Sequence, residues 1–129
     1  MKIGLASVPV DDQEKALKFY TEALGFVKKT DMPMGPDARW LTVISPEGPE
    51  GIELLLEPMG HPAAPVYQKA LYDAGIPYTS FLTDDIQKDV ARMKEHGVVF
   101  RIEPTQMEYG GTDAMFEDGC GNLINLHQV

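Results

Sequence analysis

Apolar residues recur at helical spacing in three segments of the chain. The first segment carries apolar positions at intervals of three and four residues, namely Ala16, Phe19, Tyr20, Ala23 and Leu24. A capping box formed by Asp11 and Glu14 predicts where this helix begins, and Gly25 predicts where it ends. The sequence therefore predicts an amphipathic helix between residues 11 and 25.

Two further helices follow from the same pattern. A linking helix is expected near residues 62–75, with Pro65 at its start, Gly75 at its end and an apolar face of Tyr67, Ala70, Leu71 and Ala74. The third helix is expected to begin at Asp84 as its N-cap and to stop at Gly97. Its apolar face holds Ile86, Val90 and Met93.

Eight short runs rich in β-branched and apolar residues predict strands, separated by Gly, Pro and Asp. They cover residues 3–10, 26–30, 38–45, 52–57, 77–83, 98–103, 112–117 and 122–128. The order is strand, helix and three strands, then the linking helix, then the same order again. Sliding the chain on itself places Asp11 on Asp84 and, after one deletion, Glu53 on Asn125. We therefore expect two βαβββ modules, residues 1 to about 60 and about 76 to 129, within a single α+β domain.

Composition narrows the classes of partner. The chain has 129 residues with a formal net charge of -9, which disfavours nucleic acid and anionic membrane surfaces and favours neutral or cationic ligands. No apolar run approaches the roughly 20 residues of a membrane helix, and the N-terminus lacks the pattern of a signal peptide. The single cysteine, Cys120, has no partner for an internal disulfide and is interpreted as an ordinary small residue. These observations predict a cytoplasmic protein.

Four stretches together resemble the vicinal oxygen chelate superfamily, which includes glyoxalase I, bleomycin-resistance proteins and extradiol dioxygenases. They read VDDQEKALKFYTEALGF (10–26), GIELLLEP (51–58), TDDIQKDVARMKEHGVVF (83–100) and FEDGCGNLINL (116–126). The resemblance covers the whole chain and implies curved mixed sheets that form a cleft. It also implies a homodimer, because similar small two-module proteins pair their modules across chains.

In metal-dependent members, the resemblance implies, each module supplies one ligand from its first strand and one from its last. The four equivalent positions here are Leu5, Tyr78, Glu53 and Asn125. Leucine has no donor atom, neutral asparagine is a weak donor and a phenol is a poor ligand unless it is ionised. We therefore expect neither a metal nor another cofactor.

Strand alternation assigns side chains to the two sheet faces. Ile52, Leu54 and Leu56 are expected to pack on helices, whereas Glu53, Leu55 and Glu57 point the other way. The residues predicted to line the cleft are Leu5, Ser7, Glu53, Leu55, Tyr78, Ser80, Asn125 and His127. Arg39 and Trp40 lie on opposite faces of their strand, so only one of them faces the cleft, and a buried tryptophan is the commoner outcome.

Three functions fit these residues. The first is a metal-free protein that binds a neutral or cationic small molecule in an apolar cleft. The second is a metal-independent enzyme in which Glu53 acts as general base, for example in proton abstraction next to a carbonyl. A carboxyl group bonded to Tyr78 or Asn125, with only a structural role, is the alternative for Glu53. The third function, a metal-dependent lyase or dioxygenase, is disfavoured by the four positions above.

Overall fold

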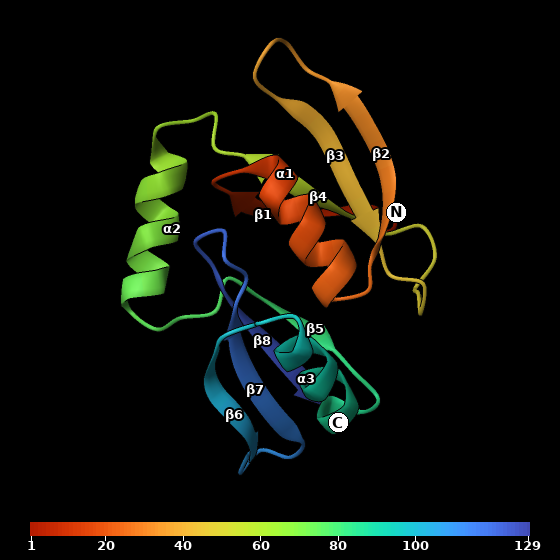
Figure 1. The fold of residues 1–129 in the computed structure, drawn as a ribbon, viewed down its shortest axis with the longest axis vertical. Coiled ribbons are helices and arrows are strands. Elements are labelled where there is room, and N and C mark those ends of the chain that lie inside the picture. Colours follow the sequence, from red (N-terminus) through yellow and green to blue (C-terminus); the bar gives the residue numbers. More distant parts are fainter.

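Two four-stranded sheets lie next to each other in the computed structural model, which describes residues 1–129 (Figure 1). The first sheet has the order β1 (Leu5–Val10), β4 (Glu53–Pro58), β3 (Arg39–Ile44) and β2 (Val27–Pro33). The second has the order β5 (Thr79–Leu82), β8 (Leu123–Gln128), β7 (Thr112–Glu117) and β6 (Phe100–Gln106). In each sheet one outer pair, β1 with β4 or β5 with β8, is parallel and the other pairs are antiparallel. The α+β class and the mixed sheets are as predicted.

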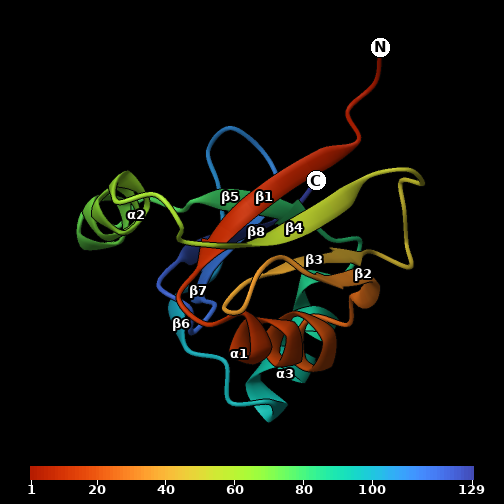
Figure 2. The same ribbon diagram turned by 90° about the horizontal axis from the view of Figure 1, so that it is seen from above.

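Helices cover only one face of the sheets. Helix α1 (Gln13–Lys18) continues as the π-helical turn η1 (Phe19–Ala23), and α3 (Ile86–Glu95) is its counterpart in the second half of the chain. Both lie on the same side of the molecule, below the strands in Figure 2. Helix α2 (Ala63–Asp73) lies apart from them, at one end of the sheets. None of these helices is long and apolar enough to cross a membrane.

The strand register separates a core face from an open face. In the β1–β4 pair, Leu5 lies opposite Glu53 and Ser7 opposite Leu55. Side chains on the alternate positions, such as Val8 and Leu56, are fully buried. Since successive side chains of a strand point to opposite faces, the predicted assignment of β4 is confirmed. We call the side away from α1 and α3 the open face.

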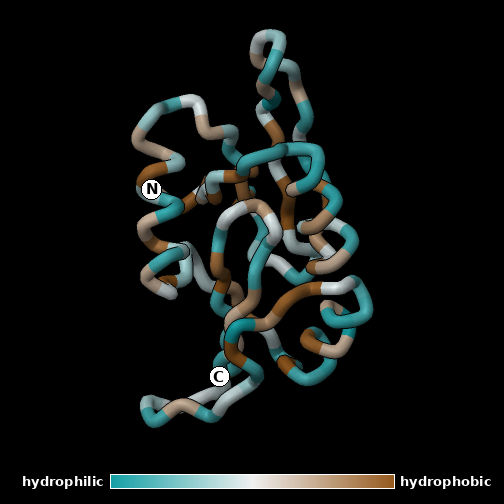
Figure 3. The backbone as a smooth tube through the Cα atoms, turned by 60° about the vertical axis from the view of Figure 1, so that its left-hand side comes forward, coloured by the Kyte–Doolittle hydropathy of each residue, from teal (hydrophilic) through white to brown (hydrophobic).

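The core consists of two apolar clusters, one under each sheet. The first contains Val8, Val10, Ala16, Tyr20, Leu41, Val43, Leu56 and Cys120; the second contains Ala23, Ile86, Val90, Met93, Val98, Ala114, Phe116, Ile124 and Leu126. Phe19, Leu24 and Phe81 pack against both clusters and so join them. Figure 3 shows the same distribution, with hydrophobic segments through the middle of the molecule and hydrophilic ones in the outer turns. Burial raises the pKa of the Cys120 thiol to about 12, as expected for a cysteine that serves as a small core residue.

Both predicted N-caps are wrong by one residue. The side chain of Asp12 accepts a hydrogen bond from the N–H of Lys15 at 3.0 Å, and that of Asp85 accepts one from the N–H of Lys88 at 3.0 Å. Asp12 has the extended backbone that a cap requires, with φ −148° and ψ 112°. Asp11 instead forms an ion pair with Lys15. Each helix is preceded by two adjacent aspartates, and in both cases the second one, Asp12 or Asp85, is the N-cap.

The predicted apolar face of α2 is also wrong. Tyr67 is 58% exposed, and the one buried residue of the helix is Gln68. The Gln68 Nε2 group shares its two N–H donors among the carbonyls of Pro9 and Cys120, at 3.0 Å each, and the side-chain oxygen of Asn122 at 3.1 Å. Helix α2 is therefore anchored by a polar side chain that satisfies buried carbonyl groups.

A buried carboxylate connects the two halves of the chain. Asp118, in the turn between β7 and β8, accepts hydrogen bonds from the Tyr20 hydroxyl at 2.8 Å and from the Asn122 side chain at 2.7 Å. It also accepts hydrogen bonds from the backbone N–H groups of Cys120 and Asn122.

Gly121 in this turn has φ +100°, and a Cβ there would lie 2.6 Å from Gln68 Oε1. The turn therefore fits against α2 only with glycine at this position.

Replacing Gln68 by alanine should lower the free energy of unfolding by about 2 kcal/mol, because the buried side-chain oxygen of Asn122 loses its donor and the carbonyls of Pro9 and Cys120 lose one of theirs. Urea denaturation of the variant measures the change. The matched control is Gln87→Ala on the exposed surface of α3, where a change of less than about 0.5 kcal/mol is expected. Equal effects of the two substitutions would contradict the anchoring role of Gln68.

Candidate functional site

The open face carries the side chains predicted for the cleft. Register pairs place Leu5 beside Glu53, Ser7 beside Leu55, and Ser80 beside Asn125. His127 follows on β8, opposite Leu82 of β5. The structure thus brings residues from both modules to one side of the molecule, but it does not gather them into one cavity.

Two cavities divide the predicted residues. Glu53 and Ser80 line a cavity of about 410 Å³ between the two sheets, which we call the inter-module cavity. Leu55 and Tyr78 line a second cavity of about 340 Å³ between the first sheet and α2, which we call the α2 cleft. Leu5, Ser7, Asn125 and His127 line neither of them.

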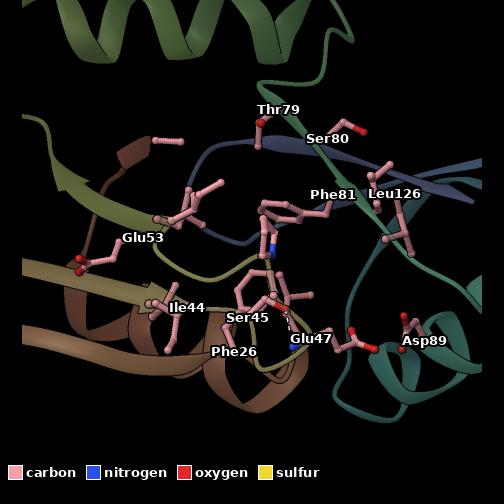
Figure 4. Close-up of a pocket in the computed structure, with 18 of the residues that line it drawn as sticks. Phe26, Ile44, Ser45, Glu47, Glu53, Thr79, Ser80, Phe81, Asp89 and Leu126 are labelled. Atoms are coloured by element: carbon pink, nitrogen blue, oxygen red, sulfur yellow. Dashed lines mark hydrogen bonds between the residues drawn. The ribbon is translucent and has the colours of Figure 1, made fainter. Parts of the chain in front are cut away.

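The inter-module cavity extends from the apolar core. Phe26 and Phe81 project into it with ring centroids 5.3 Å apart in an edge-to-face arrangement (Figure 4). Of the acidic residues that line it, Asp89 accepts a hydrogen bond from Thr83 and forms an ion pair with Arg92 at 3.1 Å, whereas the Glu47 carboxylate has no partner in the protein. Two rings of this cavity therefore already contact each other, and one of its carboxylates is paired with a cation of the same cavity.

Glu53 lies at the edge of the inter-module cavity, and Figure 4 shows its carboxylate pointing away from Phe81. Its Oε1 atom accepts a hydrogen bond from the hydroxyl of the fully buried Thr42 at 2.6 Å. That hydroxyl in turn accepts the backbone N–H of Thr30 at 3.2 Å. Thr42, and not Tyr78 or Asn125, is therefore the partner of Glu53, and its Oε2 atom makes no hydrogen bond within the protein.

The α2 cleft is an aromatic site. Trp40 from β3, Tyr67 from α2 and Tyr78 before β5 line it, with Leu55 and Met34 completing an apolar wall. The rings of Tyr67 and Tyr78 meet edge to face, with centroids 6.0 Å apart. Trp40 is only half-buried, so the commoner outcome of a core tryptophan does not hold here. Large amphipathic rings around an open cavity favour flat apolar ligands.

The charges around the α2 cleft favour a neutral or positive ligand. Arg39 lines the cleft, but its guanidinium donates to both carboxylate oxygens of Asp31, at 3.0 and 2.9 Å, and to Glu14 at 2.6 Å. The hydrogen bonds from Arg39 lower the pKa of Asp31 to about 2, so this pair remains ionised. Glu57 also lines the cleft and has no partner in the protein.

Tyr78 is a neutral phenol in this setting. Burial, followed by the influence of Tyr67 and of the Glu57 carboxylate, raises the pKa of Tyr78 above its ordinary value of 10.0. His61, from the segment before α2, accepts the N–H of Ala63 on its Nδ1 atom at 3.0 Å. In the neutral ring, the Nε2 atom of His61 is therefore a donor.

In the second sheet, polar side chains pair with one another on the open face. The Asn125 amide donates to the Ser80 hydroxyl at 3.0 Å. The Nδ1 atom of His127 lies 2.5 Å from a carboxylate oxygen of Asp113 on β7. The sequence alone does not indicate Asp113 or Thr42 as site residues, although each lies on the strand next to a predicted one.

The sequence does not predict that Trp40 and Tyr67 line the α2 cleft. Trp40 lies two positions before Thr42 on β3, so the two share a face; the pairing of Thr42 with Leu55 puts that face in the cleft. Strand alternation carried this signal once the pairing was known. The sequence predicts Tyr67 on the apolar face of its helix, and no local pattern indicates that Gln68 is the buried residue instead.

The fold and these side chains can be compared with known proteins. The family model described as Glyoxalase/Bleomycin resistance protein/Dioxygenase superfamily matches residues 2–126. The chain belongs to this superfamily. The expectation drawn from the four sequence stretches is therefore confirmed at the level of the family.

Several known proteins are similar to the chain over nearly their full length. The uncharacterized protein YurT of Bacillus subtilis (strain 168) is 54% identical, over 99% of this chain and 99% of that protein. The crystal structure of UcmS2 has a TM-score of 0.82 at 30% identity and covers 98% of this chain and 97% of its own. TnmS3, described as an antibiotic binding protein from Streptomyces sp. CB03234, has a TM-score of 0.79 at 35% identity. The match covers 99% of this chain and 95% of TnmS3.

The donor atoms of this superfamily member do not fit the metal site that the resemblance implies. Of the four equivalent positions, Leu5 offers no donor, and the amide of Asn125 is bonded to Ser80. The Oε1 atom of Glu53 already accepts a hydrogen bond from Thr42, and Tyr78 is a neutral phenol in the α2 cleft. No group of three or more His, Cys, Asp or Glu side chains lies close enough together to hold a metal ion.

Proposed function

We propose that this protein binds a flat aromatic small molecule, neutral or cationic, in the α2 cleft without a metal ion. The observation that carries the proposal is the convergence of Trp40, Tyr67 and Tyr78 on one open cavity of about 340 Å³. Cavities of roughly this size, with apolar walls and a few polar groups, are typical of small-molecule sites. The similarity to an antibiotic-binding protein supports binding rather than turnover.

Charge defines the class of ligand further. Glu57 is the unpaired charge of the cleft, since the guanidinium of Arg39 is neutralised by Asp31 and Glu14. A cation held over an aromatic ring is attracted by the ring quadrupole as well as by the carboxylate. The protein's net charge of -9 acts in the same direction. We therefore expect planar aromatic cations to bind more tightly than anions of the same shape.

Fluorescence titration with proflavine, a planar three-ring cation, tests this proposal against anthracene-2-carboxylate, a planar three-ring anion. Proflavine should bind about tenfold more tightly, and Trp40→Ala should weaken its binding by about tenfold through the lost ring contact. Glu57→Gln should reduce the preference for the cation. The control Glu22→Gln, on the exposed surface of η1, makes the same change in net charge and should leave the preference intact. Equal binding of both dyes, unaffected by Trp40→Ala, would contradict the proposal.

Metal independence is the second part of the proposal. The unsuitable donor set at the four equivalent positions supports it. Elemental analysis of the purified protein, after incubation with Zn²⁺, Mn²⁺ or Fe²⁺ and gel filtration, should find less than about one-tenth of a metal ion per chain. Glu53→Ala should make no difference. A stoichiometric metal that is lost on Glu53→Ala would show that the four positions had been misinterpreted.

A second candidate is a metal-independent enzyme with Glu53 as general base. The free Oε2 atom of Glu53, with Oε1 held by Thr42, favours this candidate. A positioned carboxylate with one free oxygen can accept a proton from a ligand that reaches it. Mass spectrometry of a ligand recovered from the protein separates the two candidates, because a binding protein returns it unchanged. Turnover that Glu53→Gln abolishes, while binding remains, would favour the enzyme.

We also propose that the protein is a cytoplasmic homodimer in which modules pair across chains. The open face supports this, since Leu5 and Met32 expose 45% and 55% of their surface there. Large apolar side chains exposed on one face are typical of protein interfaces. The reduced, buried thiol of Cys120 suits a reducing compartment.

Analytical ultracentrifugation at micromolar concentration should give the mass of a dimer. Met32→Glu, which places a charge on the open face, should shift the protein towards the monomer. The control Glu95→Lys, at the exposed end of α3, should not. A wild-type monomer at this concentration would rule out the stable dimer.

A further inference from the structure

A histidine–aspartate pair on the open face of the second sheet lies outside both cavities. Asp113 on β7 and His127 on β8 are direct partners in the antiparallel register, and their side chains meet at 2.5 Å through Nδ1 and Oδ1. The second carboxylate oxygen of Asp113 accepts a hydrogen bond from the Tyr109 hydroxyl. Both oxygens of the carboxylate are thus occupied, and both hydrogen bonds come from ring side chains.

This arrangement fixes which nitrogen of His127 is free. Burial on its own would raise the pKa of Asp113, but hydrogen bonds from Tyr109 and His127 outweigh it and lower that pKa, so the group is a carboxylate. A carboxylate only accepts hydrogen bonds, so the Nδ1 atom of His127 carries the proton. In the neutral ring, Nε2 is then an acceptor, and no residue of the protein donates to it.

Packing holds the imidazole in place. The Tyr109 ring stacks on it, with centroids 6.4 Å apart and planes inclined by 28°. On another side lies Gly111, where a Cβ would sit 2.6 Å from the Cε1 atom of His127 and 2.5 Å from the carbonyl oxygen of Gln128. Gly111 also has φ +78°, a conformation that side chains disfavour. The backbone approaches the ring so closely that only glycine fits.

The His127 side chain is 22% exposed, and two of its neighbours are more exposed and largely apolar. Leu82 lies directly opposite His127 in the β5–β8 pair and is 74% exposed, and Tyr109 is 71% exposed. A ligand that reaches Nε2 therefore meets one hydrogen-bond acceptor next to an aliphatic and an aromatic side chain. A flat apolar ring with a hydroxyl attached satisfies both features.

We propose that His127, Asp113 and Tyr109 form a recognition site for a ligand with an aryl hydroxyl group, whose O–H donates to Nε2 while its ring contacts Leu82 and Tyr109. His127 is the binding residue, and Asp113 and Tyr109 position it. The inference rests on the proposed function, because it assumes that this protein binds aromatic small molecules and specifies a chemical group that such a ligand carries. It uses none of the residues that line the α2 cleft.

The test compares 2-naphthol with 2-methoxynaphthalene, which has the same ring system but no donor. Fluorescence titration near neutral pH should show that wild-type protein binds 2-naphthol about fivefold more tightly, the effect of one hydrogen bond. His127→Phe should abolish the preference by removing the acceptor. Asp113→Asn should also abolish it, because an amide donating to Nδ1 moves the ring proton to Nε2. His96→Phe, a matched change at the exposed end of α3, should keep it.

Equal affinities of the two compounds for the wild type, or the absence of binding by either, would overturn this inference. A preference that survives in both His127→Phe and Asp113→Asn would overturn it as well. These outcomes are separate from the proflavine experiment. Proflavine binding that ignores Trp40 contradicts the α2 cleft alone, whereas naphthol binding that ignores the hydroxyl group contradicts the His127 site alone.

Discussion

The buried carboxylate of Asp118 is the interaction on which the arrangement of the two modules depends. It lies in the β7–β8 turn of the second module and accepts the hydroxyl of Tyr20 from the first. Burial raises the pKa of Asp118, although the hydrogen bonds of Asn122, Tyr20 and the turn backbone oppose this rise. An isolated buried carboxylate is costly, so these donors must be present together, and the turn, η1 and the end of β1 are held in one geometry.

The position of α2 follows from the same cluster. Asn122 donates to Asp118 and to the carbonyl of Pro9, and its own side-chain oxygen accepts from Gln68. Helix α2 is attached to the body of the protein through this glutamine, and its aromatic residue Tyr67 is thereby left facing the cleft. The aromatic site is thus a consequence of a polar anchor, because a helix packed by its apolar face would bury Tyr67.

The sequence predicted the parts of the fold that depend on local periodicity. Alternation in β4 assigned Leu56 to the core and Glu57 to the exposed side, and both assignments are confirmed. The anchoring of α2 could not be predicted, because the partners of Gln68 are backbone carbonyls of residues 9 and 120, which are far apart in the chain. The sequence predicts a single cleft, whereas the structure divides four of the predicted residues between two cavities.

The site residues divide in a similar way. Tyr78 and Leu55 were predicted from strand parity and line the α2 cleft, whereas the contribution of Trp40 depended on knowing that β3 pairs with β4. The hydrogen bond of Glu53 to Thr42 likewise crosses between neighbouring strands, and the sequence suggested other partners for it. Pairing between strands, rather than the pattern along any one of them, therefore decides which polar groups of this protein are free to meet a ligand.

The most direct measurement is a crystal structure of the protein with proflavine bound. The account predicts density for the three-ring cation in the α2 cleft, in contact with Trp40 and Tyr78 and with an amino group near Glu57. Density in the inter-module cavity between Phe26 and Phe81, with the α2 cleft unchanged, would contradict it.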